Sequence, residues 1–270
     1  MRKEYADTPQ GRLHYARDGE GPPVVLTHQT PRSADEYADV LPLLAAGGFT
    51  AIAPDTLGYG ESEPPRGAPT IETYATALLA LLDVLELPAA VVGGHHTGGV
   101  IAFEAAVAAP HRVASLVLSC TPYLDEKGRA ALRAQTPTED QPPRIDAGHL
   151  LDLWRQRAAF YPPDRPELLD RFLRDALRAW RPQAGHTAVG SYRMEDRIDR
   201  LAVPTLLLGA DADPVSYPDL DRWRQVLPDG RIAVIVGAGV PAPEHMPREF
   251  ADAIIDFLRT HHPLAGAGGS

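Results

Sequence analysis

Residues 91–100 read Val91-Val92-Gly93-Gly94-His95-His96-Thr97-Gly98-Gly99-Val100, and the rest of the chain is organised around them. The apolar residues at 89–92 predict a buried strand, and the glycines that follow allow a sharp turn. An alanine-rich run at 100–108 is typical of a helix that lies close to a sheet. The stretch therefore predicts a strand, a tight turn and a helix, with His96 at the centre of the turn.

Strand and helix patterns alternate on both sides of this turn. A capping box from Ser33 to Glu36 predicts the start of a helix, and apolar residues recur at helical spacing at 74–85 and 247–258. Alternation of this kind predicts an α/β fold with a mostly parallel, doubly wound central sheet. Apolar runs predict the other buried strands at residues 24–26, 51–55, 113–119, 205–208 and 231–236.

The alternation stops between residues 121 and 200, where proline-interrupted helical segments replace the strands. We interpret this part as a helical cap inserted over the sheet, packed in part by Trp154, Tyr161 and Trp180. The predicted division is a first part of the core at 1–120, the cap at 121–200, a second part of the core at 201–262 and a disordered tail at 263–270.

The composition narrows the classes of function. The 270 residues carry 26 Lys and Arg against 36 Asp and Glu, a formal charge of −10, with no basic cluster. This balance argues against nucleic acid or an anionic membrane surface as a partner. The single Cys120 excludes an internal disulfide, and neither a secretory leader nor an apolar run of membrane-spanning length is apparent, so we expect a cytoplasmic protein. The oligomeric state is not indicated.

The chain resembles the α/β-hydrolase fold superfamily, in its capped esterase, lyase and C–C hydrolase type, from about residue 12 to residue 260. Residues 94–98 resemble the nucleophile elbow G-x-S-x-G, with His96 in the serine position. Residues 28–31 resemble the His-Gly-x-Pro oxyanion loop, with Gln29 in place of glycine, and residues 54–62 are similar to Pro-Asp-x-x-Gly-x-Gly-x-Ser. Asp213 falls at the position of the family's catalytic acid, and Val240 at that of its catalytic histidine.

The resemblance implies a site in which two of the three triad positions differ. A serine nucleophile needs an adjacent base, and both are replaced here. We hypothesise that the His96 ring fills the space left at Val240 and bonds to Asp213, forming a dyad whose free nitrogen is a general base. Backbone N–H groups of Gln29 and Thr97 would form the oxyanion hole. Asp211 is the alternative acid.

Other polar and aromatic residues are candidates for the substrate pocket, each with a packing role as the alternative. We expect His95 to be a hydrogen-bonded core residue and His28 to support the oxyanion loop, whereas His245 is an alternative base. The histidines match no metal-ligand spacing and no cofactor-binding fingerprint is present, so neither metal nor organic cofactor is expected. The candidates are His28, His95, Tyr123, Trp154, Val240 and His245.

Three classes of function remain. The first is a hydrolase that cleaves an ester, thioester, lactone or activated C–C bond without a serine acyl-enzyme. The second is a lyase, decarboxylase, dehydratase or cyclase acting next to a carbonyl, and the third is a catalytically inactive, ligand-binding relative. Covalent catalysis by His96 is a further alternative. The apolar cap predicts a small, largely apolar carbonyl substrate. An aspartate at position 96 would have suggested an epoxide or haloalkane hydrolase, and His96 excludes that route.

Overall fold

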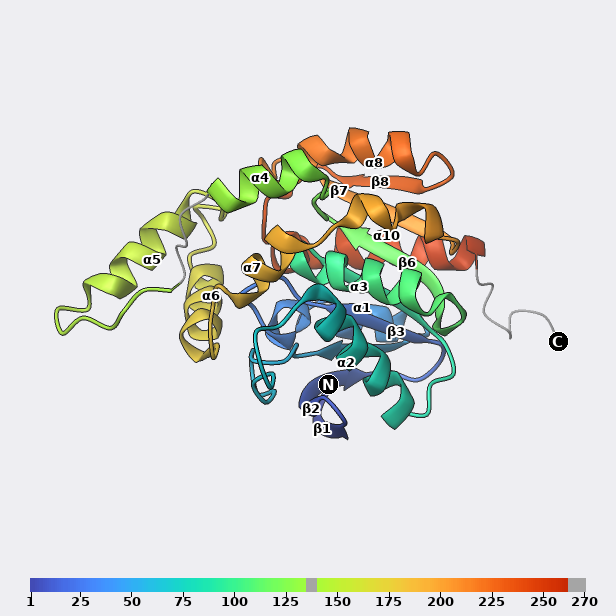
Figure 1. The fold of residues 1–270 in the computed structure, drawn as a ribbon, viewed down its shortest axis with the longest axis horizontal. Coiled ribbons are helices and arrows are strands. Elements are labelled where there is room, and N and C mark those ends of the chain that lie inside the picture. Colours follow the sequence, from blue (N-terminus) through green and yellow to red (C-terminus); the bar gives the residue numbers. More distant parts are fainter. Residues whose placement is uncertain (135–139, 262–270) are drawn as a thin grey trace.

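The computed structural model describes residues 1–134 and 140–261, in which one eight-stranded sheet forms the centre of the molecule (Figure 1). The strand order is β1-β2-β4-β3-β5-β6-β7-β8. β2 runs antiparallel to β1 and β4, whereas the pairings from β4 to β8 are parallel. The strands are β1 Arg2–Thr8, β2 Gly11–Asp18, β3 Pro23–Thr27, β4 Thr50–Pro54, β5 Ala90–His95, β6 Val113–Ser119, β7 Thr205–Ala210 and β8 Arg231–Ile235.

Side chains of the central strands alternate between two hydrophobic clusters on opposite faces of the sheet. In β3, Val24 and Leu26 belong to one cluster and Val25 to the other, because successive side chains of a strand point to opposite faces. Helices α2 and α3 cover the face of Val25, and α1 and α10 cover the other. The predicted α/β fold with a mostly parallel, doubly wound sheet is confirmed. The helices outside the insertion are α1 Leu41–Ala46, α2 Ile71–Val84, α3 Thr97–Ala108, α8 Leu220–Val226, α9 Ala242–His245 and α10 Pro247–His261.

Four helices lie between β6 and β7 in the described part of the chain: α4 Glu126–Ala134, α5 Gly148–Ala158, α6 Glu167–Arg178 and α7 Ala184–Ser191. Figure 1 shows α4 and α5 extending away from the sheet, and α7 packs against α2, α3 and α4. Tyr161 and Phe172 belong to a small hydrophobic cluster within this insertion, with Trp154 against it. Trp180 was predicted to pack the cap as well, but it lies outside this cluster and is 40% exposed.

The first turn of α3 lies against the backbone of the neighbouring strands. A Cβ atom on Gly94 would overlap the carbonyl of Gly98, and a Cβ atom on Gly98 would overlap the carbonyl of Thr27. Glycine is therefore required on both sides of the turn. The close approach brings His96 and Thr97 next to the loop that follows β3.

The capping box predicted from Ser33 to Glu36 is wrong. Ser33 caps only a short 3₁₀ helix, η1 Ala34–Tyr37, by accepting from the N–H of Asp35 at 3.2 Å. The side chain of Glu36 bonds to Gln29 instead. Gln29, which donates from its backbone N–H and from its side chain, therefore binds the Glu36 carboxylate in place of the backbone N–H of Ser33.

Two sequence predictions are not decided by these elements. No helix of the described residues is long and apolar enough to cross a membrane, and the cytoplasmic location stays a prediction. The domain limits at 120, 200 and 262 also stay predictions. The tail predicted at residues 263–270 lies outside the described residues.

Replacing Gly98 with alanine tests the contact between α3 and β3. We expect Gly98→Ala to lower the free energy of unfolding by about 1–3 kcal/mol, because the added methyl group strikes backbone rather than a movable side chain. Urea denaturation measures the change. Gly67→Ala is the matched control, since a Cβ atom there meets nothing within 4 Å. Equal stability of the two variants would contradict the close packing of the turn.

Candidate active site

His96 stands at the apex of the turn between β5 and α3, with φ 48° and ψ −115°. Non-glycine residues rarely adopt a positive φ, and such strain persists where the surrounding structure enforces it. Here the N–H of His96 donates to the carbonyl of Ser119 at 3.0 Å, and its own carbonyl accepts from the N–H of Val100 at 3.3 Å. These bonds hold the imidazole at the carboxyl edge of the parallel strands.

The His96 imidazole lies against the carboxylate of Asp213, which follows β7. Nε2 of His96 is 2.9 Å from Oδ2 of Asp213; the Asp213 side chain is fully buried and 13% of the His96 side chain is exposed. The distance is that of a hydrogen bond, but the angles are not, and Nε2 has no other partner among residues 1–134 and 140–261. Within the same residues, Nδ1 of His96 makes no hydrogen bond. The arrangement leaves Nδ1 available to a substrate or a water molecule.

The Asp213 carboxylate is held by its own loop. Oδ1 accepts from the N–H of Val215 at 2.8 Å and of Ser216 at 3.3 Å, and Oδ2 accepts from the Ser216 hydroxyl at 2.5 Å. Burial alone would raise the pKa of Asp213, but the neighbouring His96 and these hydrogen bonds outweigh it and hold the pKa well below its usual range. The alternative acid, Asp211, is exposed and bonds to the N–H of Gly237. The structure thus places Asp213, and not Asp211, beside His96.

His95 is fully buried, and its ring packs edge-on against that of His96, with the ring centroids 4.6 Å apart. Its Nε2 lies 2.7 Å from the carbonyl oxygen of Val240, which can only accept, so Nε2 carries the proton. Its Nδ1 therefore accepts from the Ser119 hydroxyl at 3.0 Å. Burial lowers the pKa of His95 to about 3, so the ring is neutral. Its hydrogen bond to Val240 holds the loop between β8 and α9, residues 236–241, against the sheet. We call this segment the Val240 loop.

The oxyanion loop differs from the sequence prediction. The backbone N–H of Gln29 donates to the buried carboxylate of Glu36 at 2.9 Å, and the Gln29 side chain donates to the same carboxylate at 2.5 Å. The backbone N–H of Gln29 is therefore not free for an oxyanion, which contradicts the role predicted for it. The N–H groups of Thr30 and Thr97, by contrast, make no hydrogen bond within the described part of the chain. His28 supports the loop, with Nε2 accepting from the N–H of Thr56 at 3.0 Å.

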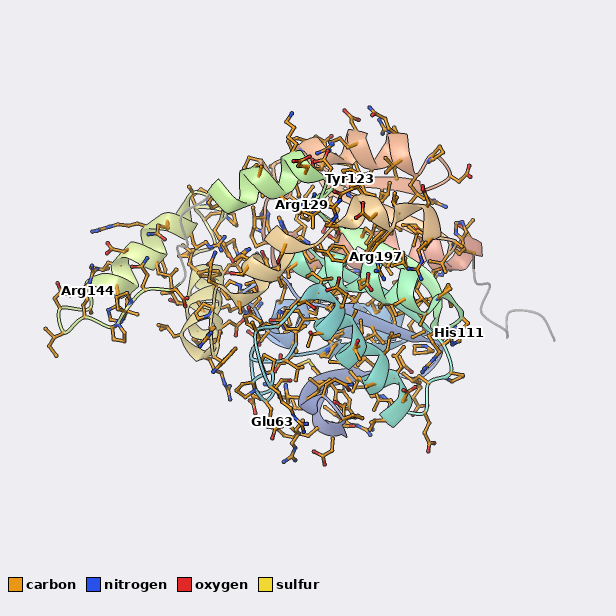
Figure 2. All side chains as sticks on the ribbon, in the orientation of Figure 1. Glu63, His111, Tyr123, Arg129, Arg144 and Arg197 are labelled. Atoms are coloured by element: carbon orange, nitrogen blue, oxygen red, sulfur yellow. The ribbon has the colours of Figure 1, made fainter. Side chains whose placement is uncertain are left out.

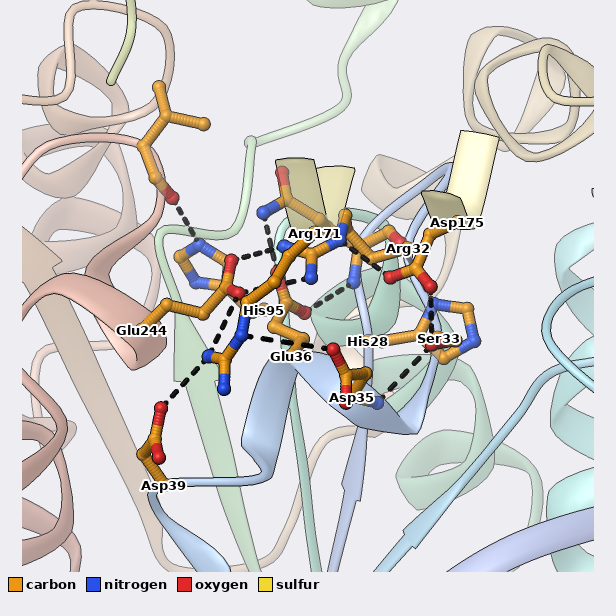
Figure 3. Close-up of polar contacts among 12 residues, drawn as sticks. His28, Arg32, Ser33, Asp35, Glu36, Asp39, His95, Arg171, Asp175 and Glu244 are labelled. Atoms are coloured by element: carbon orange, nitrogen blue, oxygen red, sulfur yellow. Dashed lines mark hydrogen bonds and ion pairs between the residues drawn. The ribbon is translucent and has the colours of Figure 1, made fainter. Parts of the chain in front are cut away.

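A buried ionic network that the sequence did not reveal lies beside this loop (Figure 3). Arg32 has no exposed surface and forms ion pairs with Glu244 of α9 and Asp175 of α6, the latter at 2.8 Å. Arg171 of α6 extends the network to Glu244 at 3.4 Å and to Asp39 at 2.8 Å. Burial alone would lower the pKa of Arg32, but the charge of Glu244 raises it well above its usual value. The network joins the oxyanion loop, helix α6 of the insertion and helix α9.

The remaining candidates for the pocket lie elsewhere or make no contact with the dyad. Tyr123 packs edge-on against Trp223, with its ring centroid 5.3 Å away, and appears beside α4 in Figure 2. Trp154 packs within the insertion's own cluster. His245 is half-buried, and its Nδ1 has no partner among the described residues. Packing accounts for Tyr123 and Trp154, whereas His245 has no contact that assigns it a role.

A polar pocket of about 160 Å³ opens on another part of the surface, between the β1–β2 hairpin and α6, and His96 does not line it. His14 and Asp55 lie at its inner wall as a buried pair, 2.7 Å apart. The described residues contain no group of three or more His, Cys, Asp or Glu side chains arranged to hold a metal ion.

In a comparison to protein families, the profile of the α/β hydrolase fold matches residues 22–239. The chain belongs to the α/β hydrolase fold family. An esterase from Thermogutta terrifontis superposes with a TM-score of 0.80 at 25% identity, covering 97% of this chain and 100% of that one. Epoxide hydrolase A from Mycobacterium thermoresistibile superposes with a TM-score of 0.77 at 25% identity, covering 96% and 98% of the two chains.

Among curated relatives, bifunctional epoxide hydrolase 2 of Mus musculus is 38% identical over 118 residues, which are 42% of this chain and 21% of that protein. The chain thus spans about a fifth of that relative's length. This family relationship accounts for the fold and for the position of the elbow, and it leaves the reaction of this member to be argued from its own side chains.

Substitution of Arg32 tests the buried network. We expect Arg32→Met to lower the free energy of unfolding by about 3–5 kcal/mol, because it leaves the buried Glu244 carboxylate with only the longer contact to Arg171, at 3.4 Å. Denaturant unfolding gives the value. The control is Arg144→Met, which removes a partly exposed pair with Asp152 at the outer end of the insertion (Figure 2) and should change stability by less than about 1 kcal/mol. Similar losses in both variants would show that burial of the Arg32 pair is unimportant.

Proposed function

We propose that the protein is a cofactor-independent hydrolase in which His96, oriented by Asp213, is the general base that activates water. The observation that carries the proposal is the 2.9 Å separation of His96 Nε2 and Asp213 Oδ2 at the apex of the elbow. A histidine next to a carboxylate has the stable proton on one ring nitrogen and the basic lone pair on the other. The family's nucleophile position is thereby occupied by a base.

In the proposed reaction Asp213 keeps the proton on Nε2 of His96. Nδ1 takes a proton from a water molecule while the water oxygen attacks a carbonyl carbon. That carbon belongs to an ester, thioester or lactone, or it is the carbonyl end of an activated C–C bond. The resulting tetrahedral intermediate collapses, and the imidazolium returns the proton to the leaving group. No serine acyl-enzyme forms, because the elbow carries no serine.

The oxyanion of that intermediate is assigned to the N–H groups of Thr30 and Thr97. Both are free of other hydrogen bonds within the described residues, and Thr97 begins α3, whose positive dipole end favours a negative charge. Thr30 takes the place that the sequence suggested for Gln29, since the N–H of Gln29 is bound to Glu36. Thr97 belongs to the elbow itself, and Thr30 belongs to the loop after β3.

The substrate class is a small, largely apolar carbonyl compound. Gly185 of α7 packs directly on the Thr30 side chain, and Thr30 and Val240 are buried, which favours a small substrate. The similarity to an esterase and to epoxide hydrolases supports hydrolysis in general. Ring opening by a carboxylate nucleophile is not part of the proposal, because the elbow presents an imidazole.

Turnover of a panel of aryl esters, thioesters and lactones by the parent and by His96→Ala tests the proposal. We expect His96→Ala to lose at least about 100-fold in kcat/KM, the contribution typical of a general base. The control His111→Ala removes an exposed histidine (Figure 2) and should keep parental activity.

Two other outcomes of the same panel would contradict hydrolysis. Absence of turnover by the parent on every panel member would redirect the assignment to a lyase, decarboxylase, dehydratase or cyclase, to be assayed on carbonyl compounds with an acidic α-proton. Binding without turnover, unchanged in His96→Ala, would indicate an inactive ligand-binding relative.

A serine-directed fluorophosphonate gives an independent test of the missing nucleophile. We expect no covalent labelling of residues 94–98 in the intact protein, because a phosphonylated serine cannot form where the elbow presents histidine. Mass spectrometry of the digested protein detects the adduct, and His96→Ser is the comparison that introduces a hydroxyl at the same position. An adduct on the parental elbow would overturn the proposal of a non-covalent hydrolase.

A further inference from the structure

Ser216 binds both oxygens of the Asp213 carboxylate. Its hydroxyl lies 2.5 Å from Oδ2 and its backbone N–H lies 3.3 Å from Oδ1. Ser216 is only 3% exposed, so solvent cannot replace these bonds. The oxygen that the Ser216 hydroxyl contacts is the one that lies 2.9 Å from Nε2 of His96.

The Ser216 hydroxyl donates a hydrogen bond to Oδ2, and Nε2 of His96 lies 2.9 Å from the same oxygen, which keeps a second lone pair to attract the Nε2 proton. The carboxylate torsion of an aspartate is otherwise broad and nearly two-fold. The backbone N–H groups of Val215 and Ser216 fix the position of Oδ1. The Ser216 hydroxyl then fixes the rotation of the Asp213 carboxylate by holding Oδ2. The lone pair of Oδ2 that the Ser216 hydroxyl does not use is left for Nε2 of His96 at the elbow.

We propose that Ser216 is a positioning residue that holds Oδ2 of Asp213 toward His96 and thereby selects the Nε2–H tautomer of the imidazole. The inference rests on the proposed function, in which Nδ1 is the base. It is assigned to the hydroxyl because, of the side chains that contact the Asp213 carboxylate, Ser216 donates a hydrogen bond to Oδ2 and the buried Cys120 thiol offers a weaker donor. The burial of Asp213 makes the loss of either contact costly.

Removing the hydroxyl has a defined chemical consequence. In Ser216→Ala the carboxylate turns away from the line to Nε2, and the Nδ1–H tautomer becomes populated. That tautomer carries its proton on the nitrogen that must act as the base, so the fraction of competent enzyme falls. Substrate contacts are untouched, so kcat falls and KM does not.

Nitrogen-15 NMR of the histidine side chains tests the inference. Spectra are recorded at alkaline pH, where imidazoles are neutral, and the His96 signals are assigned by their absence in His96→Ala. We expect the parent and Ser216→Thr to show the Nε2–H tautomer, and Ser216→Ala to show a mixture with a loss of about tenfold in kcat and KM within twofold. Ser191→Ala, which removes an exposed hydroxyl bonded to α7 carbonyls, is the matched control and should resemble the parent.

An unchanged tautomer in Ser216→Ala overturns the inference, even if His96→Ala abolishes turnover. If turnover survives in His96→Ala while the tautomer shifts in Ser216→Ala, the proposed function fails and the positioning by Ser216 stands. Where Ser216→Ala does not fold, Ser216→Cys keeps the size of the side chain with a weaker donor and should give an intermediate tautomer ratio; a parental ratio in that variant rejects the role of the hydroxyl.

Discussion

The contact between the backbone of α3 and the ends of β3 and β5 is the constraint on which this structure depends. It requires glycine at positions 94 and 98, where any Cβ atom would overlap a neighbouring carbonyl. It also keeps His96 at a positive φ, which the hydrogen bonds to Ser119 and Val100 sustain. Because the helix cannot move away from the strands without losing this contact, the side chain at the apex and the first N–H groups of α3 have fixed positions relative to the loop after β3.

This scaffold accommodates an imidazole at its apex by redistributing the neighbouring roles. Asp213 remains beside the apex and faces His96 directly. The loop at Val240 has no histidine to present, and its carbonyl instead holds the neutral ring of His95. Glu244 of α9, which follows this loop, neutralises the buried Arg32. Residues around the elbow thus divide between the His96–Asp213 pair and a set of contacts that keep that pair in place.

The features predicted correctly from the sequence depend on local patterns. Apolar runs and helical spacing determine strands and helices, and glycine spacing around His96 determines the elbow. Asp213 was placed near the elbow by the family resemblance, and the structure has its carboxylate 2.9 Å from His96; its role as the acid stays a prediction. The buried network could not be, because Arg32 meets Glu244 and Asp175 across 212 and 143 residues, among many other charged side chains. Glu36 was assigned to a local helix cap because nothing in the sequence indicates that Gln29 binds its carboxylate.

The Arg32 network also divides the insertion into parts with different freedom to diverge. Helix α5 packs on α6, whereas α6 supplies Asp175 and Arg171 to a cluster shared with the loop after β3 and with α9. A segment exchanged between relatives can replace α5 without disturbing buried charge. Exchange of helix α6, in contrast, would leave Arg32 and Glu244 without their partners Asp175 and Arg171, so these three segments, far apart in the chain, must change together.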